Sequence, residues 1–593
     1  MSSRAQRPAQ VAIVGGGPGG LFTAHLLERF AAQPFEATIF EASQRVGGKI
    51  QTARFGAIDA TYEAGAAELY DNSPVDEDPL RELVAELGLT TSAMGGGSVW
   101  LDGVRLATLE DLCERGGATA QRAFEAFDRA ARGWMSPRQF YDSDLPESFA
   151  DEPAPGQFAR WLERVEDPFA RRYIKSLIHS DLAAEPHQTN LRYGLQNYLM
   201  NDPAYMRLYS IEGGNERIVH ELAARLRARV QLGWRLEHAS VGGEGRLRLG
   251  FRAPEGPIER EFDHVVIALP HDSLAQVQFA GEPLHGALRR HVEHYDHPAH
   301  YLRISLLYSC APWRALCEQS FDMSDRFGGS CLYDESSRRP EAPYGVLGWL
   351  LGGAAAQEHA ELSDDQLVKL ALEALPAPFG DARQHFLEGR VHRWIGSVNA
   401  MPGGRVPAPI EHRHAPCGPK GPSLHLVGDY LFDSTLNGVL ESAHHVAEAL
   451  ALRLQEAHAV QPDSPSVEAP GDDPRPGPHP HTPGTRPRAP PHDRSRREHA
   501  CSRWRWSRSP IPRPRASGRA APAIASRSSD RRGCRRRSTS SLRKWTRSPT
   551  CTCCSCPPTK RTRPRGGSTF EMRSAIDSPR PACRARSCRS PVP

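Results

Sequence analysis

The N-terminal stretch "QVAIVGGGPGGLFTAHLLERF" constrains the fold most strongly, because a strand, a glycine-rich turn and a helix follow one another directly. The β-branched run Val11 to Val14 favours a buried strand, and apolar residues at helical spacing follow the turn. Gly15, Gly17 and Gly20 form the pattern GxGxxG. In this pattern the three glycines allow a sharp turn, close approach of the backbone to a pyrophosphate and tight packing of helix on strand. The stretch therefore predicts a dinucleotide-binding unit, whereas an isolated glycine pattern would be weak evidence.

A second strand, "EATIFEAS", supports the same prediction. It ends in Glu41, which follows Gly20 by 21 residues. A carboxylate at this place can accept hydrogen bonds from both hydroxyls of an adenosine ribose. The order of strand, glycines, helix, strand and acid is typical of a Rossmann-like α/β domain.

A further glycine segment bears on whether the dinucleotide is NAD or FAD. The segment "ASQRVGGKIQT" carries Arg45, Gly47 and Gly48, and "YEAGAAELYD" follows it closely. An NAD-binding unit has no need of a second glycine pair that approaches phosphate here, whereas an extended FAD molecule does. The alternative is a surface turn that ends the second strand.

These segments resemble the flavin-containing amine oxidase superfamily, which also contains protoporphyrinogen oxidases, phytoene-type desaturases and prenylcysteine oxidases. The resemblance covers about residues 9 to 455 and implies FAD as cofactor, with Arg45, Gly47 and Gly48 along its pyrophosphate and ribityl chain. The segment "ARVQLGWRLEHASV" predicts two short strands, and "FDHVVIALPHDSL" predicts a buried strand near the adenine end of FAD. Further cofactor residues on this basis are Glu63, Gly65, Ala66 and Leu236.

The segment "LHLVGDYLFDSTLNGVLESAHHVAEAL" resembles the C-terminal flavin motif of the superfamily. An apolar strand ends at Gly428 and Asp429, and the resemblance implies that the acid holds the ribityl or pyrophosphate part of FAD. A helix begins near Leu436, Asn437 and Gly438, where free backbone N–H groups would stabilise the negative charge of a reduced flavin. The alternative is a strand, turn and helix that only fill the core.

The catalytic residues are harder to identify. Arg303, in "HYLRISLLYSCAPWR", stands where many amine oxidases carry a lysine that positions water near flavin N5. Its guanidinium is a poor proton acceptor but can hold water or a substrate carboxylate. This departure favours a desaturase or isomerase as the alternative enzyme class. For Arg303 itself, the alternative is a solvated strand residue. Trp394, in "RVHRWIGSVNAMPGG", is the candidate for a ring beside the flavin, and a buried core tryptophan is its alternative.

The expected architecture is a Rossmann-like FAD-binding domain interrupted by a discontinuous α+β substrate domain, with a disordered basic tail. The helical residues 75–205 and the mixed residues 276–390 form the substrate domain. The FAD-binding parts are 9–74, 206–275 and 391–458.

The charge of the chain changes sign near residue 460. Residues 1–460 carry a formal charge of −17, and residues 461–593 carry +21. The tail is rich in Arg, Ser and Pro and cannot bury enough apolar surface to fold. Its abrupt composition is typical of a GC-rich gene translated in the wrong frame. Because the basic residues gather in the tail, any binding of nucleic acid is expected only through the tail.

Neither of two residue clusters predicts a metal site. The histidines of "HVEHYDHPAH" precede and surround a proline that breaks a helix, so we expect them to be solvated. The tail segment "CTCCSC" lacks a recognised zinc spacing. The residues concerned are His291, His294, His297 and His300, and Cys551, Cys553, Cys554 and Cys556.

The predicted function is that of an FAD-dependent oxidoreductase in the cytoplasm. No apolar run approaches about 18 residues, and five cysteines are scattered through the first 460 residues without a pairing pattern. The enzyme would transfer a hydride from an amine or amino-acid-like molecule to flavin N5, with oxygen or another acceptor as oxidant. The alternatives are a desaturase or isomerase acting on a hydrophobic substrate, and a non-catalytic flavoprotein whose tail binds nucleic acid.

Overall fold

A five-stranded parallel sheet gathers strands from three distant parts of the chain. The computed structural model describes residues 7–141, 154–317, 319–399, 408–432 and 434–459. The strand order is β10-β2-β1-β14-β21, and every neighbouring pair is parallel. The strands are β1 (Ala9–Val14), β2 (Phe35–Glu41), β10 (Arg229–Leu232), β14 (His264–Ile267) and β21 (Leu424–Leu426). This sheet is the Rossmann-like unit expected from the glycine pattern.

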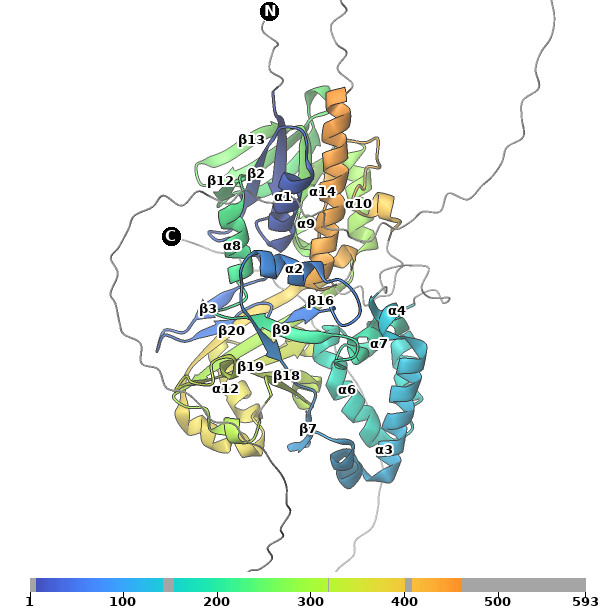
Figure 1. The fold of residues 1–593 in the computed structure, drawn as a ribbon, viewed down its shortest axis with the longest axis vertical. Helices are drawn as coiled ribbons and strands as arrows, with labels where there is room; N and C mark the ends of the chain where they lie inside the picture. The colour runs from blue at the N-terminus through green and yellow to red at the C-terminus, as the bar shows by residue number, and fades with distance from the viewer. Residues whose placement is uncertain (1–6, 142–153, 318, 400–407, 433, 460–593) are drawn as a thin grey trace, which may run out of the picture. The chain divides into compact units, whose positions relative to one another are not determined.

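Helices α1 (Pro18–Phe30) and α14 (Leu436–Ala459) lie side by side against this sheet (Figure 1). Their apolar faces share one core with α8 (Arg217–Arg225) and α2 (Pro79–Glu86). The side chain of Asp78 caps α2 by accepting hydrogen bonds from the first backbone N–H groups of the helix. Although α2 lies beyond the expected boundary at residue 75, its apolar side chains pack in the core of the parallel sheet.

A four-stranded sheet in the order β13-β12-β11-β15 contributes to the core on the other side of the parallel sheet. Phe40 of β2 stacks on Phe251 of β12 with ring centroids 4.4 Å apart. The strands are β11 (Arg235–Val241), β12 (Leu247–Ala253), β13 (Gly256–Phe262) and β15 (Gln278–Ala280). The helices α9 (His271–Leu274) and α10 (Leu284–His294) complete this part.

A seven-stranded sheet in the order β20-β16-β19-β18-β17-β7-β8 forms the second large sheet. Along β16, Leu302, Ile304 and Leu306 pack on one face with α12, whereas Tyr301 points to the face covered by α3, α6 and α7. Figure 1 shows α12 on one side of these strands and α3 and α6 on the other. The strands are β7 (Val99–Leu101), β8 (Val104–Leu106), β16 (Pro298–Tyr308), β17 (Phe321–Ser324), β18 (Ser330–Asp334), β19 (Gly345–Gly352) and β20 (Phe386–Asn399).

The remaining elements surround these sheets. The strands are β3 (Thr52–Arg54) paired with β4 (Thr61–Glu63), and β5 (Leu69–Asp71), β9 (Arg207–Ile211) and β6 (Thr91–Met94) in the order β5-β9-β6. The helices are α3 (Leu109–Trp134), α4 (Pro137–Tyr141), α5 (Gln157–Glu163), α6 (Pro168–Leu182), α7 (Leu191–Leu199), α11 (Gly353–His359), α12 (Asp364–Ala374) and α13 (Ile410–Arg413).

The expected domain boundary at residue 390 falls inside a strand. β20 pairs with β16 from Phe386 to Asn399, so the residues on both sides of that boundary belong to the seven-stranded sheet. The tail, residues 461–593, and its cysteine cluster lie outside the described residues. Within the described residues, no helix is both long and apolar enough to cross a membrane.

The expectation of solvated histidines is wrong for His291. This residue lies on α10 and is buried beside Tyr295 and Tyr430, with its Nε2 3.3 Å from the Tyr430 hydroxyl. Burial lowers the pKa of His291 to about 3, so the ring is neutral at ordinary pH. Apolar packing of α10, which the histidine spacing concealed, is the cause. Within the described ranges, no three His, Cys, Asp or Glu side chains are arranged to hold a metal ion.

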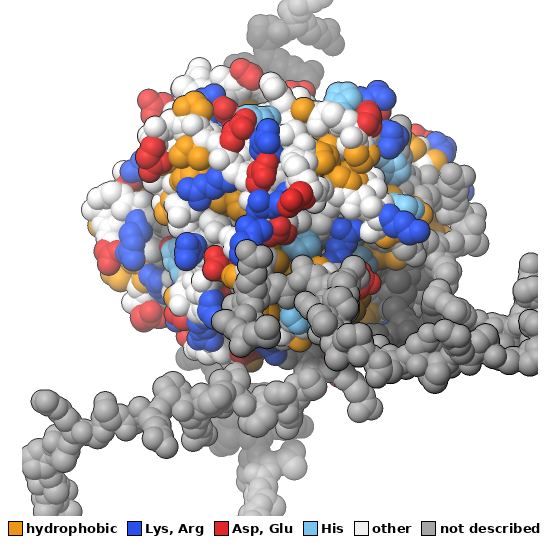
Figure 2. Space-filling view, turned by 90° about the horizontal axis from the view of Figure 1, so that it is seen from above, with side chains coloured by type: hydrophobic (Ala, Val, Ile, Leu, Met, Phe, Trp, Pro, Cys, Tyr) orange, Lys and Arg blue, Asp and Glu red, His pale blue; other side chains and the backbone are white. Residues whose placement is uncertain are grey.

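On the face drawn in Figure 2, acidic and basic side chains alternate among small apolar areas. The described residues on that face therefore form no large block of one charge sign, which a nucleic-acid surface requires. The prediction that nucleic acid binds only through the tail concerns residues outside the described ones.

Replacing Gly20 tests the close packing of α1 on β1. A Cβ atom at this position would lie 2.0 Å from the carbonyl oxygen of Gly15. We expect Gly20→Ala to lower the free energy of unfolding by about 3 kcal/mol or more, because the main chain must move apart. Gly133→Ala is the matched control: it also lies in a helix, but its Cβ would meet nothing within 4 Å. It should be neutral or stabilising by up to about 1 kcal/mol. Urea unfolding measures the free energy of unfolding of both variants, and equal values for the two would contradict the packing argument.

Candidate active site

The first glycine turn leaves room beside Gly17. Gly15 has a φ of 107°, and a Cβ there would lie 2.4 Å from the carbonyl oxygen of Ala268, so the protein itself requires glycine. At Gly17, by contrast, the nearest atom to a Cβ would be the Cα of Gly48, at 3.7 Å. The protein alone does not need a glycine at position 17. A ligand that approaches the backbone there would fill this space, as a pyrophosphate does at such turns.

Glu41 stands at the carboxyl end of β2, beside this turn. Its carboxylate accepts hydrogen bonds from the backbone N–H of Gly16 at 2.7 Å and of Ser43 at 2.8 Å. The acid is therefore held where a ribose attached to the pyrophosphate would lie. Leu236 is different, because its side chain is buried in the core beside Phe251. Any contact of Leu236 with a cofactor would have to come from its backbone.

The second glycine segment is docked on the first. The N–H of Gly47 donates to the carbonyl oxygen of Gly16 at 2.8 Å, and Gly47 and Gly48 have φ values of 108° and 53°. The Arg45 guanidinium donates to the carbonyl oxygen of Gly48 at 2.6 Å and to Oε1 of Gln51 at 3.0 Å. Arg45 is thus engaged in shaping the loop, whereas the resemblance implied that it runs along the pyrophosphate. The loop backbone is the part presented to a ligand.

Asp429 connects the C-terminal motif to the second glycine segment. Its carboxylate accepts hydrogen bonds from Nζ of Lys49 at 2.5 Å and from the N–H of Tyr430 at 2.9 Å. Gly428 precedes it and donates its N–H to Oγ of Ser442 on α14, at 3.1 Å. An ion pair between residues 380 positions apart therefore joins the two ends of the candidate cofactor site.

The start of α14 presents one unsatisfied acceptor. Asn437 donates through Nδ2 to the carboxylate of Asp78 at 3.1 Å, and its buried Oδ1 has no hydrogen-bond partner among the residues that the structure describes. This oxygen suits an N–H donor of a bound ring, so the site fits a flavin. Gly438, which we expected to offer a free N–H, donates it to the hydroxyl of Thr435 at 3.0 Å. Leu436, the first residue of α14, packs against the core that α14 shares with α1.

Glu63 is buried in a hydrogen-bond network. Its carboxylate accepts from Oγ1 of Thr52 at 2.9 Å, from the N–H of Asn215 at 3.0 Å and from Arg338 at 3.1 Å. Burial raises the pKa of Glu63 to about 7, although Arg338 opposes the shift. Its exposed fraction is 1%, so it supports the neighbouring backbone and does not itself offer an acceptor to a cofactor.

Gly65 and Ala66 follow Glu63 and lie against the second glycine segment. A Cβ on Gly65 would lie 1.9 Å from the carbonyl oxygen of Lys49, so only glycine allows this approach. The N–H of Ala66 donates to the same oxygen at 3.0 Å, and the Ala66 side chain is exposed.

Arg303 is a buried ion-pair partner, so the alternative of a solvated strand residue is wrong. Its Nη2 lies 2.9 Å from Oε1 of Glu335, and the two side chains are each 2% exposed. Nη1 donates to the carbonyl oxygen of Gly65 at 3.4 Å, and the guanidinium carbon lies 5.0 Å from the centre of the Tyr333 ring. Arg303 therefore reaches from the seven-stranded sheet to the segment expected to border the flavin.

Trp394 lies on the same face of the sheet as Arg303. In the pairing of β16 with β20, Tyr301 is opposite Trp394 and Arg303 is opposite His392, and directly opposed side chains share a face. The Trp394 Nε1 donates to the carbonyl oxygen of Ala64 at 2.7 Å, and its side chain is half-buried. Both candidate catalytic residues thus contact the Ala64–Gly65 backbone.

The sequence analysis did not identify several acidic and aromatic residues on this face. Tyr333 donates its hydroxyl to the carboxylate of Glu68 at 2.5 Å. Asp181, at the end of α6, lines a cavity of about 130 Å³ that also borders the start of α14. A sequence signal for Asp181 exists, because it falls on the apolar stripe of its helix with Ile174 and Ile178. For Glu335 no such signal exists, since it lies in the turn directly after β18 and its partner Arg303 lies on β16.

Comparison with known proteins shows similarity to flavin-dependent oxidases. The family model described as "Flavin containing amine oxidoreductase" matches residues 18–451. AofH of Mycobacterium tuberculosis, assigned as a flavin-containing monoamine oxidase, is 25% identical over 414 residues, which is 67% of this chain and 85% of AofH. The flavin-dependent L-tryptophan oxidase RebO of Lentzea aerocolonigenes is 24% identical over 46% of this chain and 60% of RebO.

Among solved structures, a putrescine oxidase bound to putrescine resembles the chain with a TM-score of 0.58. The two are 19% identical, and the match covers 75% of this chain and 99% of that one. At this identity the likeness establishes the mixed helix and sheet fold.

Removing one partner of the buried Arg303–Glu335 ion pair should lower the free energy of unfolding more than removing both partners. Glu335→Ala leaves the Arg303 guanidinium buried and uncompensated, and we expect a loss of about 3–5 kcal/mol in the free energy of unfolding. The double variant Arg303→Met, Glu335→Leu removes both charges and keeps the volume, so it should lose less. Urea unfolding followed by circular dichroism measures both. A double variant less stable than Glu335→Ala would contradict the ion-pair account.

Proposed function

Because the chain belongs to the flavin-containing amine oxidoreductase family, we propose that it binds FAD and oxidises a small molecule at a carbon next to an amine nitrogen. The chain is a flavin-dependent oxidoreductase, like the oxidases that it resembles. The observation that carries the proposal is the meeting of two glycine segments, the start of α14 and Arg303 around one site. Each of these parts suits a different portion of an extended flavin dinucleotide.

The proposed assignment of FAD, in preference to a flavin without adenosine, rests on the first glycine turn. The space beside Gly17 suits a pyrophosphate, and Glu41 at the end of β2 suits the adenosine ribose. A flavin mononucleotide would leave Glu41 without a ribose to hold. Asp429, fixed by Lys49, suits the ribityl portion between the two ends.

FAD, when bound, accepts a hydride from the carbon beside the amine nitrogen and passes the electrons to oxygen or another acceptor. Glu335 fixes the Arg303 guanidinium at the bordering backbone, so its N–H donors are held in one orientation on the proposed reacting side. A guanidinium stays protonated at any working pH, and Arg303 therefore orients water or substrate and does not accept the proton. Trp394 supplies an aromatic wall that its hydrogen bond to Ala64 holds in place.

The alternative of a desaturase or isomerase on a hydrophobic substrate receives less support from the cavity. Asp181, Gln196 and Asn197 line it together with several tyrosines. Burying these polar groups against a hydrocarbon would cost free energy that an amine substrate avoids.

Replacing Gly17 tests the cofactor assignment. A valine there fills the space proposed for the pyrophosphate, so Gly17→Val should lose bound FAD while its unfolding free energy stays within about 1 kcal/mol of that of the flavin-free wild type. Flavin released from denatured protein measures the loading, and its chromatographic identity separates FAD from FMN. Normal FAD content in Gly17→Val, or FMN in the wild type, would contradict the assignment.

Replacing Arg303 tests the charge on the reacting side. Arg303→Lys keeps a cation beside Glu335, whereas Arg303→Met removes it. We expect Arg303→Met to slow reduction of the bound flavin by amine on the order of a hundredfold, and Arg303→Lys to slow it much less. Stopped-flow measurement under anaerobic conditions, normalised to flavin content, compares them. Equal rates in the two variants would show that the charge plays no part in the reaction.

A further inference from the structure

We propose that a cavity at the amino-terminal edge of the parallel sheet binds a small polyanion, that is, a molecule with two or more phosphate or carboxylate groups. The cavity measures about 420 Å³ and is lined by residues at the starts of β1, β2 and β10 and at the end of β13. The first glycine turn lies at the other end of β1, and the length of that strand, about 20 Å, separates the two places. The inference therefore goes beyond the proposed oxidation and concerns a second site.

Arginine dominates the lining of this cavity. The charged residues of the lining are four arginines and two glutamates, which gives a formal charge of +2. Residues 1–460 as a whole carry −17, so the local excess is opposite in sign to the charge of the surrounding chain. An anion that enters the cavity would compensate this excess. The arginines are Arg7, Arg229, Arg246 and Arg260.

The nearest carboxylates are already used in ion pairs. Glu261 accepts hydrogen bonds from Arg248 at 2.9 and 3.1 Å. Asp263 accepts from Arg7 at 3.1 Å and from Arg246 at 3.0 Å, and so holds both of these side chains in place. The charges of Arg248 and Asp263, neither of which lines the cavity, cancel each other. The excess of positive charge therefore remains when these neighbours are included.

Two of the arginines lack a counter-charge. Neither Arg229 nor Arg260 forms an ion pair with a carboxylate among the residues that the structure describes. The Arg260 guanidinium carbon lies 4.6 Å from the centre of the Trp234 ring, which holds this side chain over an aromatic face. Glu36, the other acid of the lining, accepts a hydrogen bond from Nε2 of Gln10 at 3.3 Å. The N–H donors of both arginines are thus available to a carboxylate or a phosphate, whose paired oxygens match a guanidinium.

The size of the cavity limits the ligand to a small molecule. A volume of about 420 Å³ is within the range of pockets that bind metabolites. Four arginines around one cavity do not form the long basic stripe that a nucleic-acid backbone requires. Two anionic groups on one molecule can contact Arg229 and Arg260 together, which favours a polyanion over a single small anion. Phe262 adds an apolar part to the lining, which suits the carbon skeleton of an organic anion.

Chemical labelling of arginine tests the proposal on the full-length, flavin-loaded protein. Phenylglyoxal reacts with accessible guanidinium groups, and peptide mass spectrometry measures the rate at each arginine separately. Labelling is compared with and without sodium pyrophosphate, and sodium chloride keeps the ionic strength equal. Because the readout is local, pyrophosphate bound by the tail or near the flavin does not count as protection. The readout also needs no turnover, so failure of the proposed oxidation would not affect it.

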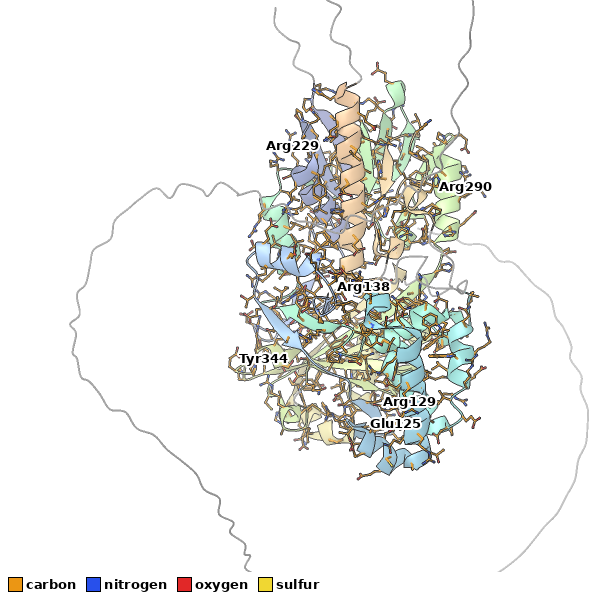
Figure 3. All side chains as sticks on the ribbon, turned by 45° about the vertical axis from the view of Figure 1, so that its right-hand side comes forward. Glu125, Arg129, Arg138, Arg229, Arg290 and Tyr344 are labelled. Carbon is orange, nitrogen blue, oxygen red and sulfur yellow. The ribbon has the colours of Figure 1, made fainter. Side chains whose placement is uncertain are left out.

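We expect pyrophosphate at ten times its dissociation constant to slow the labelling of Arg229 and Arg260 about tenfold, because about a tenth of the sites then remains empty. Arg290 on α10 is the internal control: it is also exposed, it lies outside the cavity lining, and Figure 3 shows it on a different side of the molecule from Arg229. Its labelling should change less than about twofold, because screening is the same in both samples.

Succinate, tested in the same way, separates a carboxylate ligand from a phosphate ligand. Protection of Arg229 and Arg260 by pyrophosphate alone assigns the cavity to phosphate compounds, and protection by succinate extends the assignment to dicarboxylates. If neither compound protects the two arginines, or if Arg290 is protected to the same extent, the proposal is wrong.

Substitution of Arg229 identifies the cavity as the place of binding. Arg229→Gln removes one charge at an exposed position, so fold and flavin content should be retained. The pyrophosphate concentration that halves the labelling of Arg260 should rise about tenfold or more, because a hydrogen bond to a charged group is lost. Arg290→Gln is the matched control and should leave this concentration unchanged. An unchanged concentration in folded Arg229→Gln would overturn the assignment. If Arg229→Gln does not fold, Arg260→Gln read out at Arg229 decides by the same criterion.

Discussion

The whole site depends on main-chain groups that approach one another where no side chain would fit. Gly20 lies against the carbonyl oxygen of Gly15, and Gly65 lies against that of Lys49. These contacts keep the first and second glycine segments compact, and the hydrogen bond from Gly47 to the carbonyl oxygen of Gly16 joins the two segments. The ion pair between Lys49 and Asp429 then closes the arrangement from the C-terminal side. Room for a cofactor remains beside Gly17, where an added Cβ would come no nearer than 3.7 Å to another protein atom.

A second constraint comes from charges buried on the inner face of the seven-stranded sheet. Arg303 is compensated by Glu335, and Arg338 by Glu63. Because the members of each pair neutralise one another, both arginines can be buried without an uncompensated charge.

The sequence predicted those parts of the site that depend on local geometry. The strand, turn and helix around Gly15, the acid at the end of β2 and the helix that begins at Leu436 all follow from residue order over short distances. The ion-pair partner of Arg303 does not. Glu335 is adjacent to Arg303 only because strands are paired across the sheet, and no local pattern encodes that pairing. For the same reason the interpretation of Arg303 as a solvated residue failed, and the boundary expected at residue 390 fell inside β20.

The most direct test of the account is an anaerobic titration of the purified protein with a primary amine, with product analysis. The account predicts that the visible absorption of the bound flavin is lost and that one aldehyde forms per flavin reduced, after hydrolysis of the imine. A conjugated polyene offered in place of the amine should leave the spectrum unchanged. Reduction by the polyene and by none of the amines would contradict the central claim that this site oxidises carbon next to nitrogen.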